Sequence, residues 1–281
     1  MDAPNSNPKS APSTIALPVN SAGDRLGDTY GLKAARGVAS YDKEIYLTFD
    51  TDWAGEAVLR DTIDLLDGRG VAATVFATHT SPLLATLTGH PRIEVGLHPN
   101  FSTMVDAGAP RQGAEAVLAP LHEAFPAAVS LRSHSLFQSS SLQYLFARRG
   151  LVFEANQFIP SWSGVVCKPY REITGMIRVP YFWEDDVHVM AMERNLVPAW
   201  NADAMLDRQG LKVFDFHPIH VFLNTERMDR YERSRDVHQD AERLAGHRCP
   251  SPGTRTFLID VIERGLARGF QFRRVADVQL A

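Results

Sequence analysis

The 281-residue chain has a formal net charge of −4, and 44% of its residues are hydrophobic, enough to bury one large core or two smaller ones. Acidic and basic residues are interspersed, so the sequence lacks the basic stripe that binds a phosphate backbone, and we expect no nucleic-acid partner. The two cysteines, Cys167 and Cys249, are far apart and form no CxxC. This excludes a disulfide framework as the main stabiliser and argues against thiolate ligation of zinc.

The N-terminal segment differs in composition from the rest of the chain. Its first twenty residues are rich in Pro, Ser and Asn, so we predict a poorly ordered or loosely packed arm over 1–25 and a single domain over 26–281. The segment lacks the basic stretch and long apolar stretch of a secretory signal. No apolar run approaches the roughly 20 residues of a membrane span, so we expect a cytoplasmic protein.

From residue 44 onwards, short apolar runs alternate with stretches of helical spacing. The run 44–50 (EIYLTFD) predicts a strand, and the apolar residues of 58–66 then recur at helical spacing until Gly68 and Gly70 end the helix. Further helices are predicted at 141–150 and 257–269. Further strands are predicted at 71–78, 92–98, 127–134, 151–156, 176–182 and 211–217.

This alternation of strand and helix repeats about seven times, which is typical of parallel strands with helices outside them. A closed or nearly closed (β/α) barrel fits the pattern best, and an open doubly wound sheet is the alternative.

Polar residues stand at the carboxyl end of nearly every predicted strand. In a parallel barrel these ends open onto one face, so the side chains would converge at one mouth. Aspartates, histidines and an arginine brought together in this way are typical of a metal-assisted hydrolase. The residues concerned are Asp50, Asp52, Thr78, His79, His98, Arg132, His134, His217 and His220.

Each of these residues also has a purely structural interpretation. Either aspartate alone is a fair cap for a helix that begins near Ala54, and a lone His98 or His134 is more often a hydrogen-bonded structural residue. Two carboxylates at i and i+2, however, exceed what one cap needs. Asp52 with the two histidines offers one carboxylate and two imidazoles, which zinc accepts while keeping a position open for water.

Five motifs carry a resemblance to a known family. The sequence resembles the polysaccharide deacetylases of the carbohydrate esterase family four type over about 45–220. The motif set TFDxDW, GLHPN, RSHS and HPIHxFLN is most similar to the WbmS-like branch, which is associated with lipopolysaccharide O-antigen gene clusters. The five segments are LTFDTDW (47–53), EVGLHPN (94–100), LRSHS (131–135), VPYFWED (179–185) and FDFHPIH (214–220).

The resemblance implies a fold and an activity. The fold would be α/β, a distorted (β/α)7-type barrel with parallel strands and outer helices. The activity would be metal-dependent hydrolysis of an N- or O-acetyl group on a sugar, in surface polysaccharide or O-antigen biosynthesis. The substrate would be an acylated sugar, a nucleotide sugar or an oligosaccharide. The cofactor would be one divalent metal, zinc in the first place, with cobalt, nickel and manganese as alternatives.

The resemblance also implies roles for individual residues. Asp50 would be the general base, Arg132 would orient it, and His217 would be the general acid. Asp52 and His98 would bind the metal. Residues with an expected substrate-binding or supporting role are Trp53, His79, Trp183, Glu184, Asp185, His220 and Asn224. For the acidic pair at 184–185 a solvated loop is the alternative, and His220 could instead be a fourth metal ligand.

Two departures from the family pattern leave other functions open. Thr51 separates two aspartates that are usually adjacent, and Ser102 stands where a second metal-binding histidine is usual. His134 is the candidate replacement, since it lies at the neighbouring strand end. A non-catalytic carbohydrate-binding barrel and a small-molecule amide hydrolase on the same fold are the alternative functions.

Overall fold

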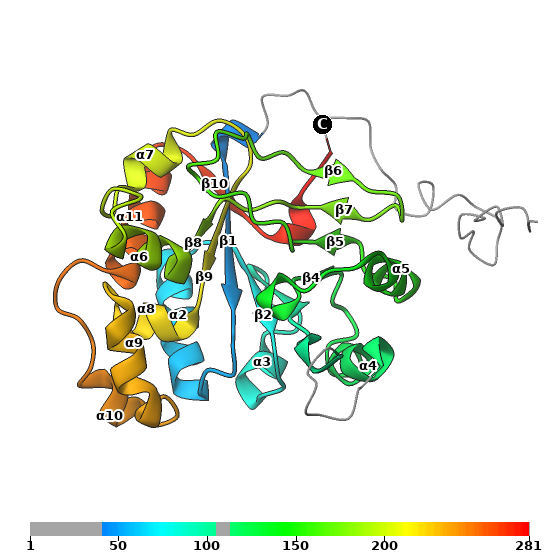
Figure 1. Cartoon of the computed structure of the whole chain (residues 1–281), viewed down its shortest axis with the longest axis horizontal. Helices are drawn as coiled ribbons and strands as arrows, with labels where there is room; N and C mark the ends of the chain where they lie inside the picture. Colours follow the sequence, from blue (N-terminus) through cyan, green and yellow to red (C-terminus); the bar gives the residue numbers. More distant parts are fainter. Residues whose placement is uncertain (1–40, 105–112, 281) are drawn as a thin grey trace, which may run out of the picture. The chain divides into compact units, whose positions relative to one another are not determined.

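The computed structural model describes residues 41–104 and 113–280. The predicted N-terminal arm at 1–25 lies outside the described residues, and the single domain over 26–281 stays a prediction. One sheet carries the described part of the chain (Figure 1). Its strands are β1 (Glu44–Asp50), β2 (Ala73–Ala77), β3 (Ile93–Leu97), β4 (Ser130–Leu131), β5 (Phe153–Glu154), β6 (Tyr170–Arg171), β7 (Ile177–Arg178), β8 (Trp183–Glu184), β9 (Lys212–Phe216) and β10 (Gln271–Arg273).

The sheet is a curled half-barrel of mostly parallel strands. The strand order is β6-β7-β5-β4-β3-β2-β1-β9-β8, and β10 pairs with the first residues of β1. Every pair is parallel except β6 with β7. The ends of the order, β6 and β8, do not pair with each other in the described part, so the barrel is distorted and open. The predicted (β/α)7-type barrel is confirmed in this form.

The helices pack on one another outside the sheet, α2 against α8, α8 against α11 and α4 against α5 (Figure 1). The α-helices are α2 (Glu56–Arg69), α3 (Pro82–Thr86), α4 (Ala114–Ala124), α5 (Ser140–Arg148), α6 (Asp185–Glu193), α7 (Ala202–Leu206), α8 (Pro218–Leu223), α9 (Met228–Ser234), α10 (Ala241–Ala245) and α11 (Thr254–Ala267). The 3-10 helices are η1 (Tyr41–Lys43), η2 (Ser102–Met104), η3 (His134–Leu136), η4 (Arg235–Val237) and η5 (Val275–Asp277).

The first strand and helix follow directly from the sequence pattern. β1 has the predicted bounds, and strands pair with both of its edges. Its residues from Ile45 to Asp50 are all buried, so both faces of the strand are covered. Helix α2 buries the apolar residues that recur at helical spacing and ends at Arg69. Gly70 follows with a φ of 66°, and its N–H donates to the carbonyl groups of Leu66 and Asp67.

The strands at 127–134 and 176–182 are shorter than predicted, and in the first a side chain replaces the main-chain ladder near the end of the strand. Arg132 N–H still donates to the carbonyl of Leu97 at 2.9 Å. The next N–H, that of Ser133, donates instead to Oδ1 of Asn156 at 2.6 Å. Beyond it the chain turns into η3, where Ser135 has a φ of 53°. The residues after β4 are thereby directed over the mouth of the sheet.

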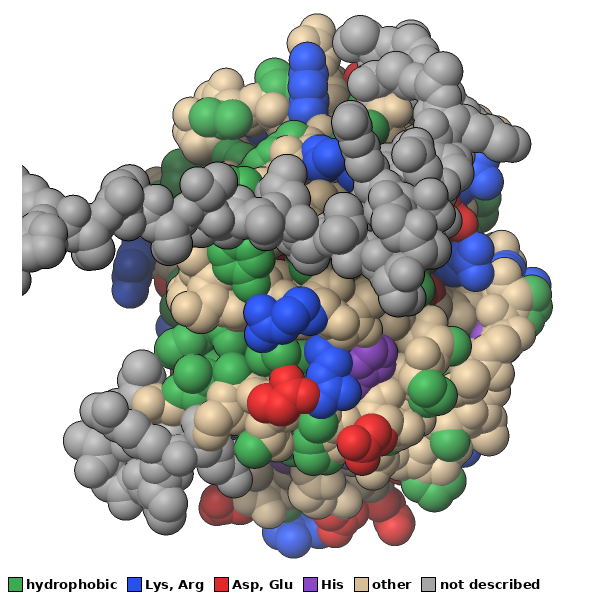
Figure 2. Space-filling model, turned by 90° about the vertical axis from the view of Figure 1, so that its right-hand side faces the viewer, with side chains coloured by type: hydrophobic (Ala, Val, Ile, Leu, Met, Phe, Trp, Pro, Cys, Tyr) green, Lys and Arg blue, Asp and Glu red, His purple; other side chains and the backbone are tan. Residues whose placement is uncertain are grey.

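The surface charge and the helices can be compared with the expectations about nucleic acid and membranes. On the face shown in Figure 2, which is turned by 90° from Figure 1, basic and acidic side chains lie interspersed. None of the helices within residues 41–104 and 113–280 has the length and apolar composition needed to cross a membrane. The cytoplasmic location stays a prediction.

Candidate active site

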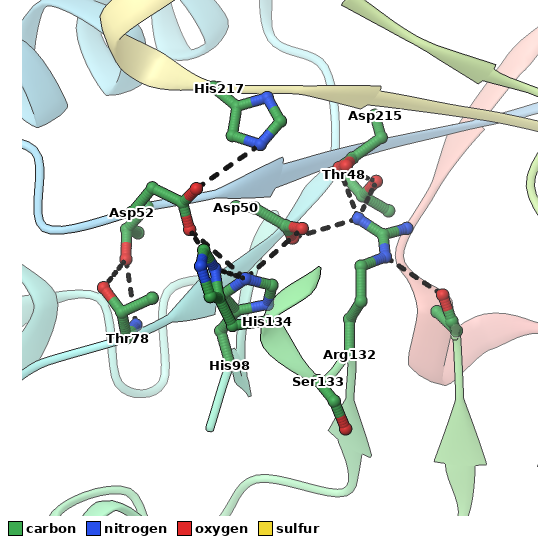
Figure 3. Close-up of polar contacts among 12 residues, drawn as sticks. Thr48, Asp50, Asp52, Thr78, His98, Arg132, Ser133, His134, Asp215 and His217 are labelled. Carbon is green, nitrogen blue, oxygen red and sulfur yellow. Dashed lines mark hydrogen bonds and ion pairs between the residues drawn. The ribbon is translucent and has the colours of Figure 1, made fainter. Parts of the chain in front are cut away.

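The carboxyl ends of β1, β3, β4 and β9 bring most of the predicted site residues together (Figure 3). Asp50 is the last residue of β1, His98 follows β3, and Arg132 follows β4. His217 follows β9 in the same way and is the N-cap of α8. Parallel strands place all these positions at one edge of the sheet, which is why residues far apart in the sequence meet here.

Asp52, His98 and His134 form a triad of possible metal ligands. Oδ1 of Asp52 lies 3.2 Å from Nε2 of His98 and 3.1 Å from Nδ1 of His134. The two ring nitrogens are 3.3 Å apart. Ligand atoms of one zinc ion, with bonds of ~2.0–2.2 Å, stand roughly 3–3.5 Å apart, so the three donors fit a single ion of this kind.

Nearby residues are consistent with this donor set. Hydrogen bonds from His134 and His98 overcome the effect of burial and lower the pKa of Asp52 well below its usual value. Nε2 of His98 is the atom directed at the triad, and the remaining ring nitrogen, Nδ1, is buried and has no partner among the described residues. Ser102 is not part of the triad, since its hydroxyl donates to Oδ1 of Asn100 at 2.6 Å.

A strained turn brings Asp52 to the histidines despite the intervening Thr51. Asp52 and Trp53 have φ angles of 40° and 57°, a left-handed conformation that bulky residues rarely adopt. The N–H of Trp53 donates to the hydroxyl of Thr78 at 3.0 Å, and its carbonyl accepts from Nε2 of Gln239 at 2.9 Å. Thr51 and Thr78 form a clasp, because their hydroxyls lie 2.9 Å apart and the N–H of Thr78 donates to Thr51 at 2.9 Å.

Asp50 lies between the triad and a buried arginine. Its Oδ1 accepts from Nη1 of Arg132 at 3.0 Å, and its Oδ2 lies 3.6 Å from Nε2 of His98 (Figure 3). The guanidinium is fully buried between the rings of Phe76 and Tyr181, 4.8 and 4.3 Å from their centroids. Arg132 therefore fixes one oxygen of Asp50 while the other faces the triad.

Asp215 is a site residue that the sequence reasoning missed. It accepts from Nη1 of Arg132 and, at 2.8 Å, from the hydroxyl of Thr48. Burial raises the pKa of Asp215 well above its usual value, although Arg132 opposes the shift. The available signal was a lone acid among the apolar residues of VFDF (213–216), in the middle of a predicted strand. Arg132 is thus shared between two buried carboxylates.

Asp185 holds His217 at two points. The Nδ1 of His217 donates to Oδ1 of Asp185 at 2.7 Å, and its main-chain N–H donates to Oδ2 at 2.8 Å. Burial alone would lower the pKa of His217, but Asp185 and then Asp52 raise it well above the usual value. The other ring nitrogen, Nε2, lies 3.6 Å from Oδ2 of Asp52 and so faces the triad.

Two cavities meet at the triad, and Asp52, Asp186 and His217 line both. The smaller, of about 140 Å³, is also lined by Asp50, His98, Ser133, His134, Tyr181 and Glu184. The larger, of about 200 Å³, is also lined by Trp53, His220, Met228, Tyr231, His238 and Gln239.

Trp183 and Glu184 were both expected at the substrate site, but only Glu184 lines one of the two cavities. Burial, and then the Asp186 carboxylate, raise the pKa of Glu184 to about 8. Glu184 accepts from the hydroxyl of Tyr181 at 3.0 Å within the smaller cavity. Trp183 is buried and packs on Phe257, with ring centroids 4.6 Å apart, and it lines neither of these two cavities.

The remaining three predicted residues make hydrogen bonds within the protein. The ring of His220 is buried beside the larger cavity, and its Nδ1 lies 3.0 Å from the hydroxyl of Thr225. His79 pairs through Nδ1 with Thr78 at 2.9 Å. Asn224 has a φ of 50°, and its amide donates to the carbonyls of Cys249 and Ser251. His79 and Asn224 line neither cavity.

Comparisons with known proteins agree with this geometry. The model of the WbmS-like polysaccharide deacetylase family matches residues 47–235. A crystal structure from Bordetella bronchiseptica, described as a candidate polysaccharide deacetylase involved in O-antigen biosynthesis, is 43% identical in sequence, with a TM-score of 0.74. The match covers 80% of this chain and 92% of that one. None of the curated proteins matches the sequence.

Two more distant structures also match. One is a candidate polysaccharide deacetylase from Mycobacterium smegmatis, 16% identical, with a TM-score of 0.45, and the match covers 85% of this chain and 96% of that one. The other is the catalytic domain of a peptidoglycan N-acetylglucosamine deacetylase from Eubacterium rectale, 15% identical, with a TM-score of 0.45. It covers 85% of this chain and 92% of the other.

Proposed function

Because the chain belongs to the WbmS-like polysaccharide deacetylase family, we propose that it is a metal-dependent hydrolase that removes an acetyl group from a sugar. The bond cleaved is the amide of an N-acetyl group or the ester of an O-acetyl group, and the sugar is one used in surface polysaccharide or O-antigen biosynthesis. One observation carries the proposal. The ligand triad lies between a carboxylate held by Arg132 and an imidazole held by Asp185, so a base and an acid face the same point.

The proposed metal is zinc, held by Asp52, His98 and His134, with cobalt, nickel and manganese as alternatives. When bound, the ion would lower the pKa of a coordinated water and polarise the acyl carbonyl. The position of His134 supports its role as substitute for the missing histidine, since its Nδ1 lies as close to Asp52 as Nε2 of His98 does.

Asp50 would act as the general base that accepts a proton from the attacking water. Its Oδ2 faces the triad while its Oδ1 is held by Arg132. The guanidinium that holds it is fully buried and donates to this oxygen from a fixed position. The base would therefore be oriented before the substrate arrives.

His217 would act as the general acid that protonates the departing nitrogen or oxygen of the sugar. Its Nδ1–H is committed to Asp185, so Nε2 is the nitrogen that exchanges a proton with the substrate. Asp185 also favours the protonated imidazole, which is the form that donates. We propose that Asp185 supports His217 in this way and does not bind the sugar directly.

Replacement of single site residues tests this assignment. Acetate release from acetylated sugars and metal content by elemental analysis are measured for each purified protein. We expect Asp50→Asn to abolish hydrolysis but keep its metal, and His98→Ala and His134→Ala to lose the metal. His122→Ala on α4, outside the site, is the control histidine. Metal binding by His134→Ala as tight as that of the wild type would contradict the three-ligand site.

The alternative functions predict different results in the same assay. A wild-type protein that is fully loaded with metal and releases no acetate from any acetylated sugar would favour the non-catalytic carbohydrate-binding barrel. Release of acid from small amides but not from sugars would favour the small-molecule amide hydrolase.

A further inference from the structure

Trp53 combines a strained main chain with an exposed side chain. Its φ of 57° is costly for a bulky residue, and hydrogen bonds from Gln239 and to Thr78 hold its peptide groups on both sides. The indole is nevertheless 45% exposed and lines the larger cavity. Because a buried anchor does not explain an exposed ring, the strained turn presents this ring to the cavity.

The size of the larger cavity indicates which part of a substrate it accepts. The cavity measures about 200 Å³. An acetyl methyl group needs little more room than a water molecule, whose share of liquid volume is ~30 Å³. The cavity is therefore several times too large for the acyl group alone, whereas a sugar ring needs a space of this order.

The positions of base and acid relative to the cavities give the same assignment. Asp50 lines only the smaller cavity, together with His98 and His134. His217 lines both cavities. The proton from His217 goes to the atom that stays on the sugar, so the sugar departs on the side that holds the acid without the base. That side is the larger cavity.

The lining of the larger cavity also selects by charge. Its charged side chains are the carboxylates of Asp52 and Asp186 and the imidazole of His217, which is already paired with Asp185. No lysine or arginine is among the described residues that line it. Because the charge of Asp52 would be offset by the metal ion that it holds, a carboxylate on the far side of the ring would meet Asp186 without a lysine or arginine to offset it.

We propose that the larger cavity is the subsite for the sugar ring, that Trp53 stacks on this ring, and that an uncharged ring is accepted in preference to a uronic acid. Aromatic faces pack against the C–H groups of a ring, while polar groups such as the side-chain oxygen of Gln239, which lines the cavity, contact its hydroxyls. The proposal rests on the proposed deacetylation, since it uses the direction of proton transfer from His217.

A binding experiment tests the subsite without turnover. The full chain carrying Asp50→Asn is loaded with zinc, and binding of methyl N-acetylglucosaminide and of the corresponding uronic acid is measured by saturation-transfer NMR titration. We expect the neutral glycoside to bind at least tenfold more tightly than the uronic acid. Adding Trp53→Ala should weaken binding of the neutral glycoside about tenfold, and Trp53→Phe should retain most of it.

Trp162→Ala is the matched control, because Trp162 is similarly exposed, at 49%, but does not line the cavity. Its binding should equal that of the parent, and thermal unfolding of each variant checks that it is folded. Unchanged binding in folded Trp53→Ala, an equal loss in Trp162→Ala, or no binding by the parent would overturn the subsite. Equal binding of the two glycosides would overturn the charge preference.

This experiment separates the subsite from the proposed function. If wild-type protein loaded with zinc releases no acetate, while the neutral glycoside still binds in a manner that depends on Trp53, the deacetylation is wrong and the ring subsite stands. If acetate is released but binding does not depend on Trp53, the deacetylation stands and the subsite is wrong.

Discussion

Two buried histidines, His217 beside helix α6 and His188 within it, have opposite surroundings. His217 is held by Asp185, the first residue of the helix, and its pKa is raised well above the usual value against the effect of burial. His188, one turn further along the helix, lies among Trp183, Trp200 and Phe257. Neither of its ring nitrogens has a hydrogen-bond partner among the described residues, and burial lowers its pKa to about 4.

The difference shows that burial alone does not decide the charge of a histidine here. Both rings are removed from water, which disfavours the imidazolium in each case. A carboxylate at 2.7 Å reverses the effect for His217, whereas His188 is opposed only by the charge of Asp185, with no hydrogen bond to its ring among the described residues. One histidine is therefore prepared to donate a proton, and the other stays neutral as part of the aromatic core.

Replacement of Asp185 by Asn should reduce this difference, because it gives His217 surroundings closer to those of His188. The amide cannot stabilise an imidazolium, and it no longer selects the tautomer with the proton on Nδ1. We expect the kcat for acetate release to fall by about 10²–10⁴, the usual contribution of a positioned general acid. Metal content should stay unchanged. Wild-type kcat in a folded Asp185→Asn protein would contradict the role of the pair.

The second prediction concerns stability and pH at His188. The unfolded chain protonates this histidine near its ordinary pKa of 6.5, whereas the folded protein does so only near pH 4. Stability should therefore be lost as the pH falls from about 6.5 to 4. At ~1.4 kcal/mol for each pH unit, this one group accounts for a loss of about 3 kcal/mol.

Urea unfolding of wild type and His188→Leu at pH 4.5, 5.5 and 7.5 measures this effect. Other groups titrate in both proteins, so the informative quantity is the difference between their free energies of unfolding. His188→Leu should gain stability relative to wild type as the pH falls. A difference that does not change with pH would mean that His188 finds a hydrogen-bond partner or water in solution.

Much of this arrangement could be predicted from the sequence, because it follows from strand topology. Parallel strands place their carboxyl ends together, so Asp52, His98 and His134 were expected at one mouth, and the structure does bring them together. Helix α2 and strand β1 followed from apolar spacing. The roles of these side chains stay predictions.

Other features could not be predicted because they depend on tertiary contacts. The short β4 results from the competition of the Asn156 side chain for a main-chain N–H, which no local pattern shows. Asp215 becomes a partner of Arg132 only when β4 and β9 curl toward each other. Trp183 was expected at the substrate site, and its aromatic cluster with His188 and Phe257 is visible only in the packed core.

The smallest expected effect concerns the Thr51–Thr78 clasp. As with His217 and His188, the test compares a group that has its hydrogen-bond partner with the same group without it, here a main-chain N–H. Thr51→Val keeps the shape of the side chain but removes its hydroxyl. This hydroxyl accepts a hydrogen bond from the N–H of Thr78 at 2.9 Å and shares a second one with the Thr78 hydroxyl. Loss of one or two hydrogen bonds should loosen the strained turn and weaken zinc affinity about tenfold, which is ~1.4 kcal/mol.

Isothermal titration of zinc into metal-stripped protein measures this affinity independently of catalysis. Thr51→Ser retains the hydroxyl and should bind zinc within about twofold of wild type. Thr62→Val is the control, since this buried threonine lies within α2, outside the turn, and loses a hydrogen bond to Val58. If Thr51→Val binds as tightly as Thr51→Ser, the turn is held by Gln239 and by packing around Trp53, and the residue between the two aspartates serves only as a spacer.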